Sequence, residues 1–208
     1  ATITATTTSG NRTATCAITG ASGLNTATPG WGSSMGTVSF ATGSTWTVGG
    51  RRWSDVVVLS SCASRTSFSG EVNNSGSITY LADGRNNPTW KGTLLSWAAV
   101  IRYQDQLCPN NWRVPTDSEF AALNSAVGSM VTPTGQSPHV VHWGAQLSGY
   151  CFSAGTLNFQ GAQGRCWSAT QGSAAGSAYH LNYSATNTGS TAADYKSYGY
   201  PLRCIEQN

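Results

Sequence analysis

The segment CPNNWRVPTDSEF, residues 108–120, decides the fold because it joins a cysteine, a tryptophan and a helix start in one short run. Two further cysteine motifs follow in order, RCW at residues 165–167 and RCI at residues 203–205. This order indicates a disulfide frame around a tryptophan-rich core. The segment at 171–200 lies between the last two motifs and is left free to vary, so we look for function there.

Two helices stand out in the sequence. Thr116 and Glu119 have the spacing of a capping box, and Gly128 marks the end of the helix that they begin. Its apolar face comprises Phe120, Leu123 and Val127. An earlier apolar stripe at helical spacing comprises Leu94, Leu95, Trp97, Ala98, Val100 and Ile101.

Composition bounds the class of protein. Charged residues are 9% of the 208 residues, while 39% are hydrophobic and eight are tryptophans, so the chain has apolar mass for a core. The net charge of +3 is scattered without a basic run, which predicts no nucleic-acid partner. No apolar run is long enough to cross a membrane, so we expect no membrane insertion. Six cysteines in so weakly charged a chain favour an oxidising compartment.

Short β-prone runs fill the first quarter of the chain. Residues 1–20 are threonine-rich and alternate apolar with polar residues, which is typical of an edge or half-buried strand. Runs at 37–42, 45–48 and 56–59 follow, with a turn signal at Gly49 and Gly50. We expect residues 1–36 to be a β extension or the end of a preceding module, and residues 37–208 to be the ligand-binding domain.

Five segments in order resemble the Fibrobacter succinogenes major paralogous domain family of bacterial surface and secreted modules. They are TVGGRRW at 47–53, SWAA at 96–99, CPNNWRVPT at 108–116, WSAT at 167–170 and RCI at 203–205. The resemblance covers residues 40–208 and implies an α+β, C-type lectin-like fold, with two helices packed on small twisted antiparallel sheets and long loops.

The resemblance also implies a disulfide between Cys108 and Cys204, which ties the entry of the second helix to the last strand. That leaves Cys151 with Cys166, and Cys16 with Cys62, as the remaining expected pairs. The same fold carries the variable proteins of diversity-generating retroelements. The Gly, Ser, Ala, Thr, Asn and Tyr composition of 171–200 fits such a variable stretch and equally fits an ordinary loop.

The run from Tyr179 to Ser184 alternates, so its two sets of side chains face opposite ways. Tyr179, Leu181 and Tyr183 are expected in the core. This directs the ligand-binding candidates His180, Asn182 and Ser184 toward solvent, where they either meet a ligand or form a hydrated strand face.

Further candidates precede the last strand and follow WSAT. Tyr195, Lys196 and Tyr198 have the composition of a binding surface, in which tyrosine offers a large rigid contact area, although their rings also suit a core edge. Gln171 and Ser173 are expected to rim the same surface.

Metal and catalytic chemistry find little support. His139 and His142 lack the glutamate and the helical frame of a zinc protease, because Pro138 and the valines after His139 favour extended chain. The sequence has neither a calcium-binding lectin motif nor a catalytic motif, so we expect no metal, no cofactor and no enzyme activity.

The sequence therefore predicts a secreted, cell-surface or virion-surface module that binds a protein or glycan ligand on another cell or on a host surface. The alternatives are a structural subunit of a surface or fibre assembly and an oxidase of the formylglycine-generating type that uses Cys151 and Cys166. The ligand and the oligomeric state are not encoded in any motif.

Overall fold

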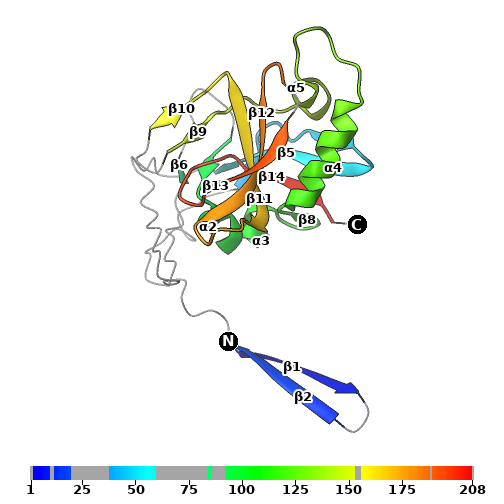
Figure 1. Cartoon of the computed structure of the whole chain (residues 1–208), viewed down its shortest axis with the longest axis vertical. Helices are drawn as coiled ribbons and strands as arrows, with labels where there is room; N and C mark the ends of the chain where they lie inside the picture. The colour runs from blue at the N-terminus through cyan, green and yellow to red at the C-terminus, as the bar shows by residue number, and fades with distance from the viewer. Residues whose placement is uncertain are drawn as a thin grey trace.

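The computed structural model describes residues 38–59, 92–152, 156–187 and 189–207, and the backbone of the strands at 2–9, 12–19 and 84–85. The fold is mixed α+β, as expected, and its strands pair antiparallel (Figure 1). The threonine-rich start forms a hairpin of two strands, β1 (Thr2–Ser9) and β2 (Arg12–Thr19), where the sequence suggested one. The expected division at residue 36 stays a prediction.

The central sheet joins the start of the domain to its end. Its strand order is β3-β5-β14-β8, with β4 also paired to β5. The strands are β3 (Val38–Phe40), β4 (Thr45–Val48), β5 (Arg51–Leu59), β8 (Trp112–Arg113) and β14 (Arg203–Glu206). The predicted turn between β4 and β5 is confirmed, because Gly49 and Gly50 have positive φ angles of 60° and 70°.

A separate three-stranded sheet has the order β11-β12-β13. Its strands are β11 (Gln163–Gln171), β12 (Ser177–Ser184) and β13 (Ser190–Tyr195). Two small ladders also lie in the described part of the chain. They pair β6 (Gly84–Arg85) with β7 (Leu94–Leu95), and β9 (Tyr150–Cys151) with β10 (Leu157–Asn158).

Helix α4 (Asp117–Gly128) begins and ends where the sequence predicts. The Thr116 hydroxyl accepts from the Glu119 backbone N–H, and the Glu119 carboxylate accepts from the Thr116 N–H, so the capping box is complete. Phe120, Leu123 and Val127 are buried on the predicted face.

The other helices differ from expectation. Leu94 and Leu95 form strand β7, which pairs with β6, and Leu95 also exchanges backbone hydrogen bonds with Tyr200. Within that stripe only α2 (Trp97–Arg102) is helical. A single turn, α3 (Gln104–Leu107), follows. The extended chain expected around His139 is wrong: residues Pro138–Trp143 form helix α5, with the proline at the start, where its missing N–H costs nothing.

Helix α4 packs between the two sheets. Its Phe120 stacks on Trp53 of β5, and the same buried cluster contains Leu181 and Tyr183 of β12 and Ile205 of β14. A second cluster lies around Trp167 of β11, with residues of α2 and the central sheet. One face of the three-stranded sheet is therefore packed against α4 and the rest of the domain.

One disulfide joins Cys108 to Cys204, as the resemblance implied, across 96 residues of sequence. The expected pairing of Cys151 with Cys166 is wrong. Cys166 is a buried thiol that faces the Tyr183 hydroxyl, whereas Cys151 packs in a different cluster with Leu94. The expected pair of Cys16 and Cys62 lies outside the described side chains.

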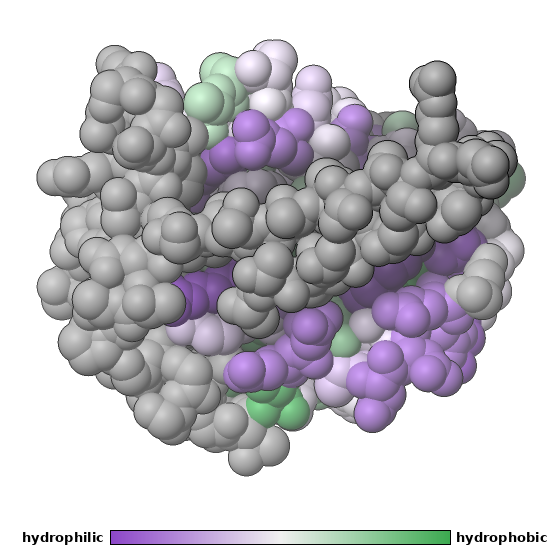
Figure 2. Space-filling view, turned by 90° about the horizontal axis from the view of Figure 1, so that it is seen from below, coloured by the Kyte–Doolittle hydropathy of each residue, from purple (hydrophilic) through white to green (hydrophobic). Residues whose placement is uncertain are grey.

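The described residues in view on the face shown in Figure 2 are mainly hydrophilic, with a few hydrophobic residues between them. Among the described residues, no helix is long and apolar enough to span a membrane.

Candidate functional site

The three-stranded sheet presents two faces, and both are partly covered. Cys166, Leu181 and Tyr183 point into the cluster shared with α4, as the alternation predicts for the two β12 residues. The opposite face carries Arg165, His180 and Asp194, which are in cross-strand or diagonal register. Rings from the neighbouring loops lie over this second face, so it is not a simple solvent-facing surface.

The expected exposure of His180 is wrong. Its side chain is only 2% exposed, because the ring of Tyr200 lies 4.8 Å and that of Trp167 5.9 Å from its own ring. Burial lowers the pKa of His180 to about 4, and the charge of Arg165 acts in the same direction. His180 is therefore a neutral, buried side chain that packs against the rings of Trp167 and Tyr200.

The expected exposure of Lys196 is also wrong, since the residue is 2% exposed. Its ammonium donates to the Ala175 carbonyl at 2.7 Å and lies 4.4 Å from the centre of the Trp97 ring. Burial lowers its pKa. Lys196 thus ties the turn between β11 and β12 to helix α2.

A polar frame fixes the centre of the second face. The Arg165 guanidinium donates to Asp194 at 3.0 Å and to the Tyr200 hydroxyl at 2.8 Å, and that hydroxyl donates to Asp194 at 2.8 Å. The backbone N–H of Tyr195 donates to the other Asp194 oxygen at 2.9 Å. Because strands β11 and β13 and the loop that carries Tyr200 meet in this one network, the residues that pack on it are held rigidly.

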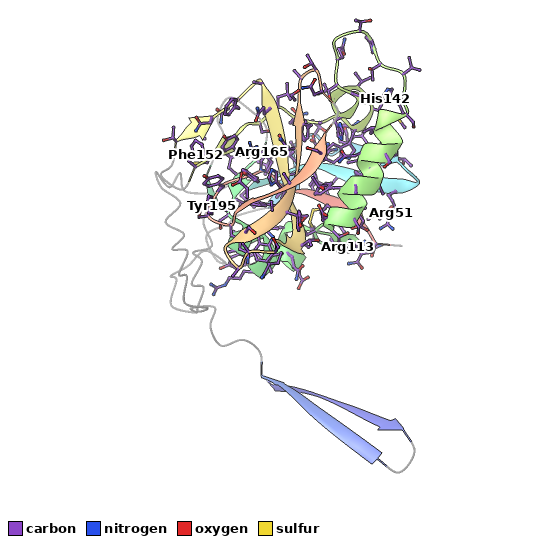
Figure 3. The ribbon with its side chains drawn as sticks, viewed as in Figure 1. Arg51, Arg113, His142, Phe152, Arg165 and Tyr195 are labelled. Atoms are coloured by element: carbon purple, nitrogen blue, oxygen red, sulfur yellow. A yellow bond between two sulfur atoms is a disulfide. The ribbon has the colours of Figure 1, made fainter. Side chains whose placement is uncertain are left out.

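Aromatic rings cover this frame and form what we call the aromatic surface. It consists of Tyr150, Phe152, Phe159, Tyr195 and Tyr198. Arg165 lies 4.0 Å from the Tyr150 ring centre, and Tyr150 in turn stacks on Phe159 at 5.7 Å. Figure 3 shows Phe152, Arg165 and Tyr195 on the side of the molecule away from Arg51 and Arg113.

Two rings of the aromatic surface reach far into solvent. Phe159 is 50% exposed and Tyr195 is 56% exposed. Phe159 also has a φ of 58°, a left-handed conformation that is unfavourable for a bulky side chain. Its carbonyl accepts from the N–H groups of Ala162 and Gln163, so the turn holds the exposed ring in this conformation.

A small polar cavity of about 230 Å³ opens at the end of the sheet where β11 begins and β12 ends. Its lining residues are Gln163, Asn182, Tyr183, Ser184, Asn187 and Ser190. Among the described residues, no charged side chain lines it.

The structure divides the predicted site residues between two ends of the sheet. Tyr195, Gln171 and Ser173 are exposed at one end, with Tyr198 half-buried beside Tyr195. The half-buried Asn182 and Ser184 line the polar cavity at the other end. Along β12 the two ends are about 16 Å apart.

Sequence reasoning missed the residues of the site that precede position 171. Tyr150, Phe152, Phe159 and Arg165 all lie before the segment that we singled out, and none belongs to a functional motif. The run Tyr150-Cys151-Phe152 was the available signal, because its two aromatic residues flank a cysteine of the predicted disulfide frame.

The histidine pair of α5 has a structural role. The His139 ring accepts from the Gly189 N–H at Nδ1, so its Nε2 carries the proton and donates to Asn124 at 2.7 Å. Burial lowers the pKa of His139 to about 4, with a contribution from Arg203. Within the described part of the chain, no three His, Cys, Asp or Glu side chains are grouped to hold a metal ion.

In comparisons with known proteins, no family model, no curated protein and no solved structure matches the chain.

Proposed function

We propose that the chain is a C-type lectin-like, non-catalytic binding module, secreted or displayed on a cell or virion surface, that recognises a protein or glycan ligand. The contact region is the aromatic surface, and the polar cavity lies at the other end of the same sheet. The lectin-like fold is supported by the sequence resemblance and by the disulfide between Cys108 and Cys204, which the resemblance implied.

The observation that carries the proposal is a pair of exposed aromatic rings on a rigid hydrogen-bonded frame. Phe159 and Tyr195 are half-exposed, and Arg165 and Asp194 fix the strands and rings beneath them. When a ligand covers such rings, the protein loses little conformational entropy, because the rings are already ordered. The Gly- and Ser-rich composition of 171–200 is compatible with diversification by a retroelement.

The oxidase alternative has a chemical difficulty. Its chemistry requires a reactive thiolate, but burial raises the pKa of Cys166 to about 12. A thiol of this kind remains protonated and inaccessible, so we do not propose the oxidase.

The test compares two double variants in saturable binding of the labelled chain to a panel of intact bacterial and animal cells. Phe159→Ser with Tyr195→Ser removes the two exposed rings. Val131→Ser with Val141→Ser is the matched control, since these valines are 92% and 38% exposed and lie outside the aromatic surface. We expect at least tenfold weaker binding for the aromatic variant alone, which is the scale of a contact hot spot.

Equal binding by both double variants would overturn the proposed contact region. Absence of saturable binding to every cell type in the panel would instead favour the structural-subunit alternative.

A further inference from the structure

We infer that the polar cavity between β11, β12 and β13 is a subsite for one uncharged sugar unit of a glycan. This inference rests on the proposed function and deepens it, since it chooses a glycan over a protein ligand and assigns the cavity a separate role from the aromatic surface. It is carried by the chemistry, the arrangement and the size of the cavity.

The cavity offers polar groups that the protein does not use. The Gln163 Oε1 atom is buried and has no hydrogen-bond partner among the described residues. Within the same described ranges, the side chains of Asn182 and Ser190 make no hydrogen bond either. By contrast, the Ser184 hydroxyl is occupied, because it accepts from the N–H groups of Thr186 and Asn187.

An unpartnered buried acceptor is costly unless a ligand or water satisfies it. The uncommitted groups are two side-chain amides and one hydroxyl, which together donate and accept. A sugar hydroxyl also does both, so a polyhydroxylated ring matches this set. A carboxylate or an ammonium does not, because no charged side chain lines the cavity and the nearby Arg165 is already paired with Asp194.

Strand pairing holds these three groups in place. Asn182 is directly opposite Ser190 on β13, while Gln163 on β11 is opposite Ser184 and therefore diagonal to Asn182. Alternation puts Gln163, Asn182 and Ser190 on one face of the sheet. Their backbones are fixed by the ladders, so ordering them for a ligand costs little.

The volume limits the occupant. At about 230 Å³ the cavity is smaller than the roughly 300–1,000 Å³ of sites that enclose drug-sized ligands. One pyranose ring is of suitable size, whereas a folded protein or a peptide of several residues is not. The exposed Phe159 ring lies in the turn that leads into Gln163 and is available to a neighbouring unit of the same glycan.

The direct test is a titration followed by protein NMR. The probes are glucose, galactose, mannose and N-acetylglucosamine, with N-acetylneuraminic acid as the charged comparison. We expect at least one neutral sugar to shift the side-chain amide signals of Asn182 and Gln163 saturably, with a dissociation constant of about 1 mM, as befits a single small unit.

Two variants make the test specific. Asn182→Leu keeps a similar size but removes the amide, and we expect sugar affinity to fall at least tenfold. Gln106→Leu is the matched control, because Gln106 is an exposed amide on α3 outside the cavity, and its affinity for the sugar should be unchanged. An unchanged heteronuclear NMR spectrum outside the cavity verifies that Asn182→Leu is folded.

The inference is overturned if no neutral sugar shifts these two amides, if only the charged sugar does, or if Asn182→Leu binds sugar as well as the parent chain. None of these results touches the proposed function, which fails if no cell type binds the chain or if cell binding is independent of Phe159 and Tyr195. Periodate oxidation of the cell-surface glycans, at a concentration that also cleaves the ring diols of neutral sugars, separates the two further. Binding that is lost after oxidation supports the sugar subsite. Binding that survives identifies a protein ligand and overturns the sugar subsite.

Discussion

At the scale of single residues, packing decides which side chains of the 171–200 segment reach solvent. The alternation in β12 was predictable because it follows from strand geometry alone, and Leu181 and Tyr183 are buried as expected. The burial of His180 was not predictable, because nothing local indicates that the chain after β13 returns and places Tyr200 over the other face of the sheet. The burial of Lys196 was not predictable for a similar reason, since its partners Ala175 and Trp97 are distant in sequence.

The two buried histidines make the stability of the fold dependent on pH. Both have a pKa of about 4 in the folded chain, against 6.5 in an unfolded one. Between these values the unfolded chain binds more protons, so the free energy of unfolding rises with pH and is complete above pH 6.5. We predict a loss of up to about 1.4 kcal/mol per pH unit for each histidine as the pH falls from 6.5 to 4.

Denaturant unfolding at several pH values, with NMR titration of the imidazole signals, measures this dependence. A free energy of unfolding that stays constant from pH 4 to 6.5 would contradict the burial of neutral histidines.

Glu119 adds a further loss of stability at lower pH. Although its burial alone would raise its pKa, hydrogen bonds from Arg113 and Thr116 hold the pKa at about 2. Its contribution is therefore present above pH 4.5 and disappears as the pH falls through 2.

At the scale of elements, local signals predicted structure where they act alone. The capping box fixed the start of α4, and the glycine pair fixed the turn between β4 and β5. Helix α5 is not predicted because Pro138 and the valines after His139 favour extended chain, although proline is also well suited to the first turn of a helix. The aromatic surface was missed because its rings come from separate loops that only the folded sheet brings together.

The end of α5 provides a prediction at this scale. Gly144 has a φ of 60°, and a Cβ there would lie 2.2 Å from the Trp46 ring. Gly135 has a φ of 80° but would meet nothing within 4 Å. Both Gly→Ala changes strain the backbone, but only Gly144→Ala also displaces Trp46 from its position against Arg203.

We therefore predict that Gly144→Ala destabilises the fold by at least about 1 kcal/mol more than Gly135→Ala does. Thermal and denaturant unfolding of the two variants measures the difference. Equal destabilisation would show that the contact between Gly144 and Trp46 is not close in solution.

At the scale of the whole molecule, the frame is closed by a covalent bond between the end of α3 and the last strand. The resemblance to a known family implied the bond between Cys108 and Cys204, whereas the pairing of Cys151 with Cys166 followed only from counting and is wrong. The two cysteines of that expected pair lie in separate buried clusters, which no spacing in the sequence indicates.

Removal of this bond should weaken the whole domain. In the chain-entropy model, closing a loop of 96 residues contributes about 4–5 kcal/mol. We predict a loss of this size for Cys108→Ala with Cys204→Ala, which is comparable to the total stability of many domains. If that variant does not fold, the shift of the denaturation midpoint on adding a reductant gives the same quantity. A midpoint that is unaffected by reductant contradicts the prediction.

The claim that the β11–β13 face with its aromatic surface contacts the ligand is tested most directly by hydroxyl-radical footprinting of the chain bound to cells. We predict that the bound chain is protected from oxidation at Phe159 and Tyr195, while Val131, which is 92% exposed, is oxidised to the same extent as in the free chain. Protection at Val131 with unchanged oxidation of both aromatic rings would contradict it.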